Sequence, residues 1–88
     1  MNQQDILDEI VALLEANGIT VRNEPMGGCG GGLCTVRNQP VVFLDTDAPV
    51  TERAAVAGRA LNSLIDIQNI YLRPETREFV ERQSSAVE

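Results

Sequence analysis

The sequence has no histidine, lysine or tryptophan, and only one tyrosine and two phenylalanines among its 88 residues. A chain without histidine cannot form the Cys-His pair of a cysteine protease, and it lacks the commonest ligand of transition metals. A chain without lysine cannot complete a phosphate-binding Walker loop. No recognisable acid-base pair replaces these groups, so the composition predicts a protein that is not an enzyme.

Positive charge is scarce as well. Thirteen Asp and Glu residues stand against seven arginines, which gives a net charge of −6 at pH 7, and the arginines are dispersed between positions 22 and 82. Nucleic acids and anionic membranes both require clustered cations on the protein surface. We therefore expect neither as a partner, and expect instead another protein or a second copy of this chain.

Long apolar runs are also missing. In the segment 1–18, Asp8, Glu9 and Glu15 interrupt the apolar residues, and no cationic stretch precedes them. This pattern is typical of neither a signal peptide nor a membrane span, so a cytoplasmic location is expected. In a reducing compartment the two cysteines are expected to be thiols rather than a structural disulfide.

The length and composition predict one folded domain. A chain of 88 residues has room for a single core, and its 43% apolar and 23% charged residues are near the values of globular proteins. No internal repeat or linker divides it. We expect a single domain over residues 1–83 and a frayed C-terminal tail over residues 84–88.

Three segments carry helical signals. Residues 3–16 have apolar side chains at helical spacing, with Asn2 as the N-cap and Asn17-Gly18 as the stop signal. A longer amphipathic helix is expected within residues 45–66, with Pro49 at its first position after Asp47 or Ala48, and a short one is expected to begin at Pro74. The core-facing arc of the longer helix contains Val50, Ala54, Ala57, Leu61, Leu64 and Ile65.

Three further segments, 19–24, 33–37 and 41–45, have the patterns of strands, and the last two form a hairpin around residues 38–40. The third segment begins with four consecutive apolar residues, which favours either a strand covered on both faces or a central strand of the sheet. The connections between successive strands are too short for a parallel crossover. The expected fold is therefore α+β in two layers, with a three-stranded antiparallel sheet, helices packed on one face, and the order α-β-β-β-α-α.

The segment MGGCGGGLCTV, residues 26–36, combines five glycines with two cysteines. The register of a dinucleotide-binding fingerprint fails, and Leu33 and Cys34 stand where a Walker loop needs lysine and Ser/Thr, so no nucleotide cofactor is expected. Our main interpretation is a glycine-rich turn between strands. Cys34 then alternates with Val36 on a buried strand face, as a small core residue.

An alternative function uses the same cysteines as a thiol redox or metal-binding module. Cys29 and Cys34 are spaced C-x4-C, near the spacing of zinc ligands. Two thiolates do not complete a tetrahedral site, so a metal would need carboxylates or a symmetric dimer, and we expect no bound metal. We also expect Cys29, among glycines, to react faster than Cys34.

Residues 32–64, GLCTVRNQPVVFLDTDAPVTERAAVAGRALNSL, resemble the hairpin-then-helix segment of the ImmA/IrrE-type zinc metallopeptidases. In that family an apolar strand leads to a Glu-Arg pair and then to a helix that carries HExxH. Alignment on Glu52-Arg53 places Arg59 and Ser63 at the two histidines and Ala60 at the glutamate. The resemblance thus implies the architecture without a zinc ligand or a catalytic base. The whole chain also resembles short single-domain proteins of bacteria.

By elimination, the predicted function is that of a small, non-enzymatic cytosolic domain that acts through protein–protein interaction. Asp45 and Asp47, between the third strand and the second long helix, are interpreted as helix-capping rather than catalytic residues. No catalytic residue and no cofactor are predicted. The candidate partner surface is the polar face of the longer helix, which contains Glu52, Arg59, Asn62, Ser63 and Asp66.

Overall fold

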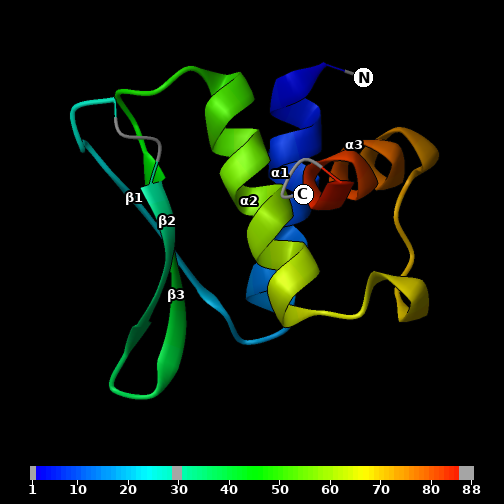
Figure 1. Ribbon diagram of the computed structural model, residues 1–88, viewed down its shortest axis with the longest axis horizontal. Helices are drawn as coiled ribbons and strands as arrows, with labels where there is room; N and C mark the ends of the chain where they lie inside the picture. Colours follow the sequence, from blue (N-terminus) through cyan, green and yellow to red (C-terminus); the bar gives the residue numbers. More distant parts are fainter. Residues whose placement is uncertain (1, 29–30, 86–88) are drawn as a thin grey trace.

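A computed structural model describes residues 2–28 and 31–85 of the chain (Figure 1). The elements in chain order are α1 (Gln3–Ala16), β1 (Thr20–Glu24), β2 (Gly31–Val36), β3 (Gln39–Asp45), α2 (Val50–Leu64), the 3₁₀ turn η1 (Ile67–Asn69) and α3 (Pro74–Ser85). The predicted α+β class, with three helices and three strands, is confirmed. Helix α3 continues through residues 84 and 85, which the sequence analysis assigned to a frayed tail.

Helix α1 begins and ends where its polar residues predict. The Asn2 side chain accepts a hydrogen bond from the Asp5 backbone N–H at 2.9 Å, and the Asp5 carboxylate accepts one from the Asn2 N–H, which completes a capping box. Beyond Ala16, Gly18 adopts a φ of +81°, a left-handed conformation that ends the helix at little steric cost. Its four fully or nearly fully buried residues are Ile6, Leu7, Ile10 and Leu14.

The sheet is mixed, so the predicted antiparallel sheet is wrong. The strand order is β1-β3-β2, with β3 parallel to β1 and antiparallel to β2. The prediction considered only connections between strands adjacent in sequence, which are indeed too short for a parallel crossover. Here β2 itself is part of the connection from β1 to β3, because the chain crosses to the far edge as β2 and returns between the two strands as β3. Of the two alternatives predicted for β3, the central position is confirmed, whereas coverage on both faces is wrong because the helices lie on one face of the sheet only.

A two-residue turn joins β2 to β3. Arg37 and Asn38 have φ values of +52° and +66°, the combination of a type I′ turn, whose twist matches that of a hairpin. In such a hairpin Val36 and Gln39 exchange hydrogen bonds, and the pairs beyond them alternate between bonded and non-bonded. Pro40, opposite Thr35, therefore occupies a non-bonded position where its missing N–H disrupts nothing on the β2 side.

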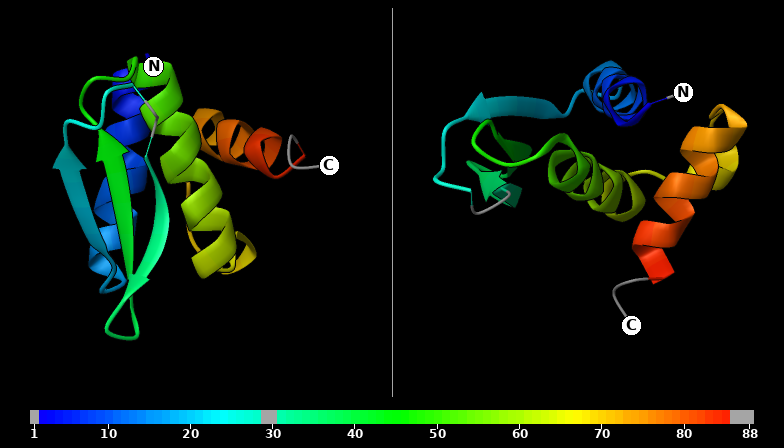
Figure 2. Two further views of the ribbon diagram at one scale, coloured as in Figure 1. Left: turned by 60° about the vertical axis from the view of Figure 1, so that its left-hand side comes forward. Right: turned by 90° about the horizontal axis from the view of Figure 1, so that it is seen from above.

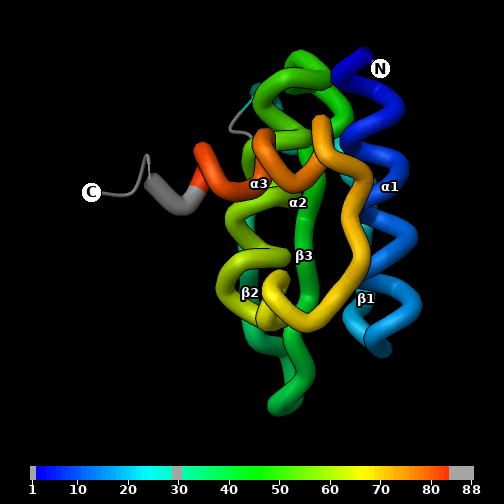
Figure 3. Tube along the Cα trace, turned by 90° about the vertical axis from the view of Figure 1, so that its right-hand side faces the viewer, coloured from blue at the N-terminus to red at the C-terminus, as the bar shows by residue number. Residues whose placement is uncertain are grey.

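The elements form three layers rather than the predicted two. Helices α1 and α2 cover one face of the sheet, and α3 crosses the side of this helix pair that is turned away from the sheet (Figures 2 and 3). Helix α2 is thus packed between the sheet and α3. Val56, Gly58 and Ala60 are buried in addition to the predicted core arc, because that arc accounted for only one of the two sides that α2 buries.

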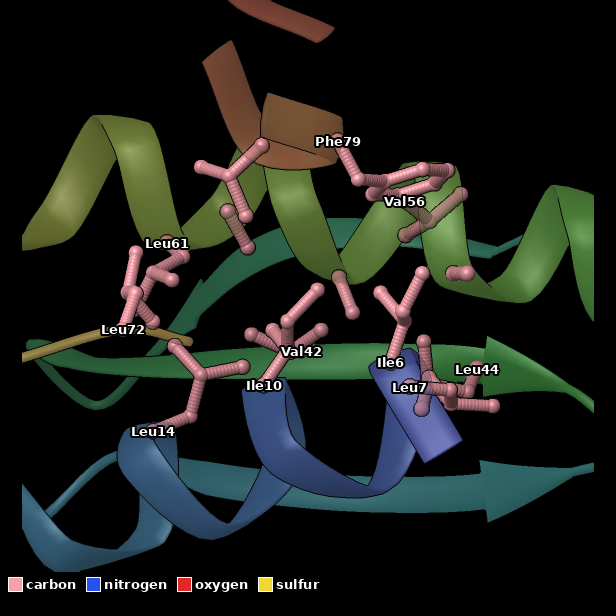
Figure 4. Close-up of a cluster of buried hydrophobic side chains, with 14 of the residues drawn as sticks. Ile6, Leu7, Ile10, Leu14, Val42, Leu44, Val56, Leu61, Leu72 and Phe79 are labelled. Carbon is pink, nitrogen blue, oxygen red and sulfur yellow. The ribbon is translucent and has the colours of Figure 1, made fainter. Parts of the chain in front are cut away.

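The core lies between the sheet and the helices (Figure 4). Val42 and Leu44 of β3 point into it, whereas Val41 and Phe43 alternate onto the opposite face, which no helix covers. On that face the Arg22 guanidinium lies 6.0 Å from the centre of the Phe43 ring. Among the described residues, no helix combines the length and the apolar character needed to cross a bilayer.

Helix α3 is held to α1 through Glu9. The Glu9 carboxylate accepts hydrogen bonds from the Thr76 hydroxyl at 2.7 Å, the Arg73 Nε at 2.9 Å and the Arg73 backbone N–H at 3.2 Å. Burial raises the pKa of Glu9, but the hydrogen bonds from Thr76 and Arg73 and the charge of Arg73 outweigh it and lower the pKa below its ordinary value. The Glu9 side chain is only 14% exposed, and its lowered pKa keeps the carboxylate ionised at neutral pH although it is largely buried.

Candidate functional site: the free edge of strand β2

The structure places Cys34 in an exposed position, so the prediction of a buried Cys34 is wrong. Val36, its neighbour on the same strand face, is 46% exposed. Alternation correctly places the two side chains on one face of the strand, but it is the face turned away from the helices. Cys29 lies outside the described residues, so its relative reactivity and the thiol or metal module that depends on it stay predictions.

The first residues of the glycine-rich segment are held by Asp45, the last residue of β3, and by Asp47, two positions later. Asp45 is fully buried, and its Oδ1 accepts hydrogen bonds from the N–H groups of Met26 and Asp47, both at 2.8 Å. The Asp47 Oδ2 accepts one from the Gly27 N–H at 3.0 Å. The capping interpretation is therefore wrong, since α2 has Pro49 at its N-cap and no side-chain cap. Both carboxylates instead fasten the loop that leads toward β2.

The first residue of β2 has to be glycine. Gly31 has a φ of +93°, and a Cβ at this position would lie 2.0 Å from the carbonyl oxygen of Phe43. The backbones of β2 and β3 therefore approach more closely here than any side chain permits. This contact fixes where β2 joins the sheet.

The outer edge of β2 is not paired with another strand in the described part of the chain, since β2 is the last strand of the sheet. The hairpin register decides which backbone groups face outward. Leu33 and Thr35 occupy the non-bonded positions opposite Val42 and Pro40, so their N–H and C=O groups point away from β3. The strand thus presents a short row of donors and acceptors at alternate residues.

A hollow of about 110 Å³ lies between this edge and α2. Leu33 lies beside the hollow and is 41% exposed. Because it is paired with Val42, its side chain lies on the face of β2 that is turned toward α2. Cavities of about 150 Å³ accommodate benzene, so this open hollow has room for part of one apolar side chain. The residues that line it are Gly32, Leu33, Val56, Arg59, Ala60 and Ser63.

The arginines near β2 differ from the others. Arg22, Arg73 and Arg82 form ion pairs with carboxylates, and Arg53 and Arg77 donate hydrogen bonds to backbone carbonyls. Within residues 2–28 and 31–85, the side chains of Arg37 and Arg59 form neither kind of contact. Arg59 lines the hollow, and Arg37 follows directly after β2. No acidic residue lines the hollow, so two unneutralised cations flank the edge.

The structure divides the predicted partner surface. Glu52, Arg59, Ser63 and Asp66 are exposed, as expected. Asn62 is only partly exposed, because its amide donates a 2.7 Å hydrogen bond to the Val80 carbonyl of α3, a helix whose position the sequence did not reveal. Asp66 caps η1 by accepting a hydrogen bond from the Gln68 N–H. Only Arg59 and Ser63 of the five lie together beside β2.

The other edge of the sheet offers less to a partner. Along β1 the Arg22 and Glu24 side chains form an ion pair at 2.7 Å, and charged side chains on an edge strand discourage pairing. The hollow beside it carries Asp8, Glu15 and Arg53 among its lining residues. In the described ranges, no group of three Cys, Asp or Glu side chains is arranged to hold a metal ion.

Comparison of the chain with protein-family models, curated proteins and solved structures gives no match. The resemblance of residues 32–64 to the ImmA/IrrE segment stays a prediction. In the structure, the residues aligned with the HExxH motif lie on α2 beside β2, with Arg59 and Ser63 exposed and Ala60 buried. No known protein therefore helps to interpret this site, and its function has to be inferred from the structure of this chain.

Proposed function

We propose that this chain is a small, non-enzymatic, cytosolic protein-binding domain. In this proposal it captures an extended segment of another protein, which adds to the sheet along the free edge of β2. The observation that carries the proposal is that edge, where the outward N–H and C=O groups of Leu33 and Thr35 lie beside the hollow on α2. In strand addition, main-chain hydrogen bonds supply affinity and adjacent side-chain pockets supply the choice of partner.

The lining of the hollow supports binding rather than catalysis. Ser63 is the only hydroxyl nucleophile among the lining residues, and none of them is a general base that would activate it. Leu33, Val56 and Ala60 instead offer an apolar wall to a side chain. A site that buries one apolar side chain and pairs a backbone edge has what recognition of an extended segment requires.

A different protein fits this edge better than a second copy of the chain. Pairing of β2 with itself about a two-fold axis would keep the helices on one face of the joined sheet and would bring the two Arg59 side chains toward each other. Each copy also carries a net charge of −6. Like charges at and around such an interface oppose self-association.

The test is selection of random ten-residue peptides displayed for binding to the purified protein, followed by titration of the selected peptides. Substitution Thr35→Pro removes an outward N–H without removing a hydrogen bond to β3, because Thr35 lies opposite Pro40 at a non-bonded position. We expect Thr35→Pro to weaken binding at least tenfold. Thr35→Val keeps the N–H and the strand propensity, and is expected to bind within about threefold of the unmodified protein.

A second measurement covers the case in which Thr35→Pro does not fold, as judged by circular dichroism. Methylation of single backbone nitrogens along a selected peptide is expected to reduce binding at alternate positions only, because only alternate amides face β2. Equal binding by Thr35→Pro and Thr35→Val, or loss of binding at successive amides, would contradict the proposal. Sedimentation showing a dimer that Thr35→Pro dissociates would assign the edge to a second copy instead.

A further inference from the structure

We infer that the segment bound at β2 is acidic, and that Arg59 recognises an Asp or Glu side chain within it. This inference rests on the proposed function, since it names the chemistry of the partner for the same edge. It begins from Arg59 and Arg37, whose side chains form no hydrogen bond or ion pair among the described residues. An arginine guanidinium pairs with a carboxylate through two parallel hydrogen bonds, which gives the contact both energy and direction.

The register places a partner carboxylate within reach of Arg59. Residues directly opposite each other on neighbouring strands share a face of the sheet, and Leu33 and Thr35 both face the helix side. The partner residues opposite them therefore also face α2 and are two positions apart. One meets the wall formed by Val56 and Ala60, and the other can reach Arg59. The expected motif is an apolar residue and an acidic residue separated by one position.

The rest of the molecule makes this preference selective. The chain has thirteen acidic residues and a net charge of −6, so an acidic segment is repelled over most of the surface. At the hollow the balance is reversed, because Arg59 lines it, Arg37 follows the last residue of β2, and none of the lining residues is acidic. Attraction confined to one edge guides an acidic segment to it and fixes its position there.

The carboxylate belongs to a side chain rather than to the end of the partner chain. Arg59 lies beside the hollow near Leu33, whereas Arg37 follows the last residue of β2 at the hairpin turn. A segment that continues along the whole strand passes both cations, and a chain that ended at Arg59 would leave Arg37 without a partner. We therefore expect a continuous acidic segment.

The experiment repeats the peptide selection with three proteins: the unmodified chain, Arg59→Glu, and Arg82→Glu as a control. Arg82 is an exposed arginine of α3, so its reversal changes the net charge equally but away from β2. We expect peptides selected by the unmodified chain and by Arg82→Glu to be enriched in Asp and Glu, with an apolar residue two positions away. Arg59→Glu is expected to select Lys and Arg instead, and to bind the original peptides at least tenfold more weakly.

Substitution of the acidic residue in a selected peptide by its amide separates the possibilities. A tenfold loss toward the unmodified protein, absent toward Arg59→Gln, supports the inference. Peptides that bind regardless of charge, but still lose binding to Thr35→Pro, would overturn the inference and leave the proposed function standing. Peptides whose binding depends on a free C-terminus rather than on the side chain would also overturn it. Failure of Thr35→Pro to affect any peptide would reject both.

Discussion

At the scale of single residues, Gly31 is the described glycine with the least room for a side chain. A side chain there would combine a φ of +93° with a Cβ located 2.0 Å from the Phe43 carbonyl oxygen. We expect Gly31→Ala to lower the free energy of unfolding by at least about 2 kcal/mol, since a left-handed conformation alone costs an L-residue roughly 1–2 kcal/mol. Thermal unfolding followed by circular dichroism measures the change.

The adjacent glycine provides the matched control for this prediction. A Cβ on Gly32 would meet no atom within 4 Å, and its backbone is not left-handed. Gly32→Ala is therefore expected to change stability by no more than about 0.5 kcal/mol. If the two variants unfold at the same temperature, the close approach of β2 and β3 at Gly31 is not as described.

The sequence patterns correctly predicted which residues share a face of a strand or helix, but not always which of the two faces is covered by the rest of the fold. The alternation of Cys34 and Val36 placed both side chains on one side of a strand, and that relation holds. Which side the helices cover depends on packing far away in sequence, so burial of Cys34 could not be derived locally. Arg59 and Ser63 were correctly predicted as surface residues, because polar side chains on an amphipathic helix usually face solvent. Asn62 was predicted on the same face, but its contact with α3 depends on a packing partner that the local pattern does not reveal.

At the scale of secondary-structure elements, α2 is the helix on which the rest of the fold packs. Leu61 of α2 is fully buried in the core, whereas Arg59, two positions earlier on the same helix, is exposed. We expect Leu61→Ala to cost roughly 2–5 kcal/mol, the usual range for truncation of a core leucine. Arg59→Ala is expected to cost no more than about 0.5 kcal/mol. Urea unfolding of both variants gives the comparison, and a reversed order would mean that α2 is rotated about its axis.

The attachment of α3 to α1 makes stability depend on pH. The pKa of Glu9 is lower in the folded chain than its ordinary value of 4.5, so as the pH falls the unfolded state takes up this proton first. The stabilisation is complete above pH 4.5 and is lost as the pH falls through that value toward the lower folded pKa. We expect Glu9→Gln to lower stability by about 1–3 kcal/mol at pH 7, the value of hydrogen bonds to a charged group.

The distinguishing feature of Glu9→Gln is its pH profile. The variant and the unmodified protein should converge in stability at low pH, because the ionised carboxylate no longer contributes to either. Glu78→Gln is the control, since Glu78 is 74% exposed and its oxygen lies 4.0 Å from Arg82. A Glu9→Gln variant that stays less stable by a constant amount across this range would show that packing, rather than charge, attaches α3.

Elements were predictable where their signals are local. The capping box of Asn2 and Asp5, the left-handed Gly18 and the proline at the start of α3 set boundaries within a few residues of where the structure has them. The pairing of strands was not predictable in the same way. Thr20 meets Val41 across β1 and β3, and nothing in either segment encodes that partnership. The candidate site depends on it, because Leu33 and Thr35 are free only if β2 is an edge.

At the scale of the whole molecule, three helices and three strands share one core, and the sheet has two edges of different character. The β1 edge carries an ion pair, whereas the β2 edge carries outward backbone groups, an apolar hollow and two arginines without partners in the described chain. One face of the sheet is covered by α1 and α2, and the other carries Phe43 under Arg22. These differences are the reason that we propose the β2 edge, and not the β1 edge, as the place where a partner strand is added.

The strand order also determines when the sheet can form during translation. The middle strand β3 follows both of its neighbours in the sequence, so no strand pairing can begin on the ribosome before β3 emerges, and the sheet cannot be complete until residue 45 has emerged. At translation rates of roughly 5–20 residues per second, β1 waits about 1–4 s for its partner after its own last residue is made. During that interval the nascent chain does not yet contain the strand that pairs with β1. Charged side chains on a strand discourage pairing whether or not the sheet is complete, so we expect Arg22 and Glu24 also to disfavour association of β1 with other chains during this interval.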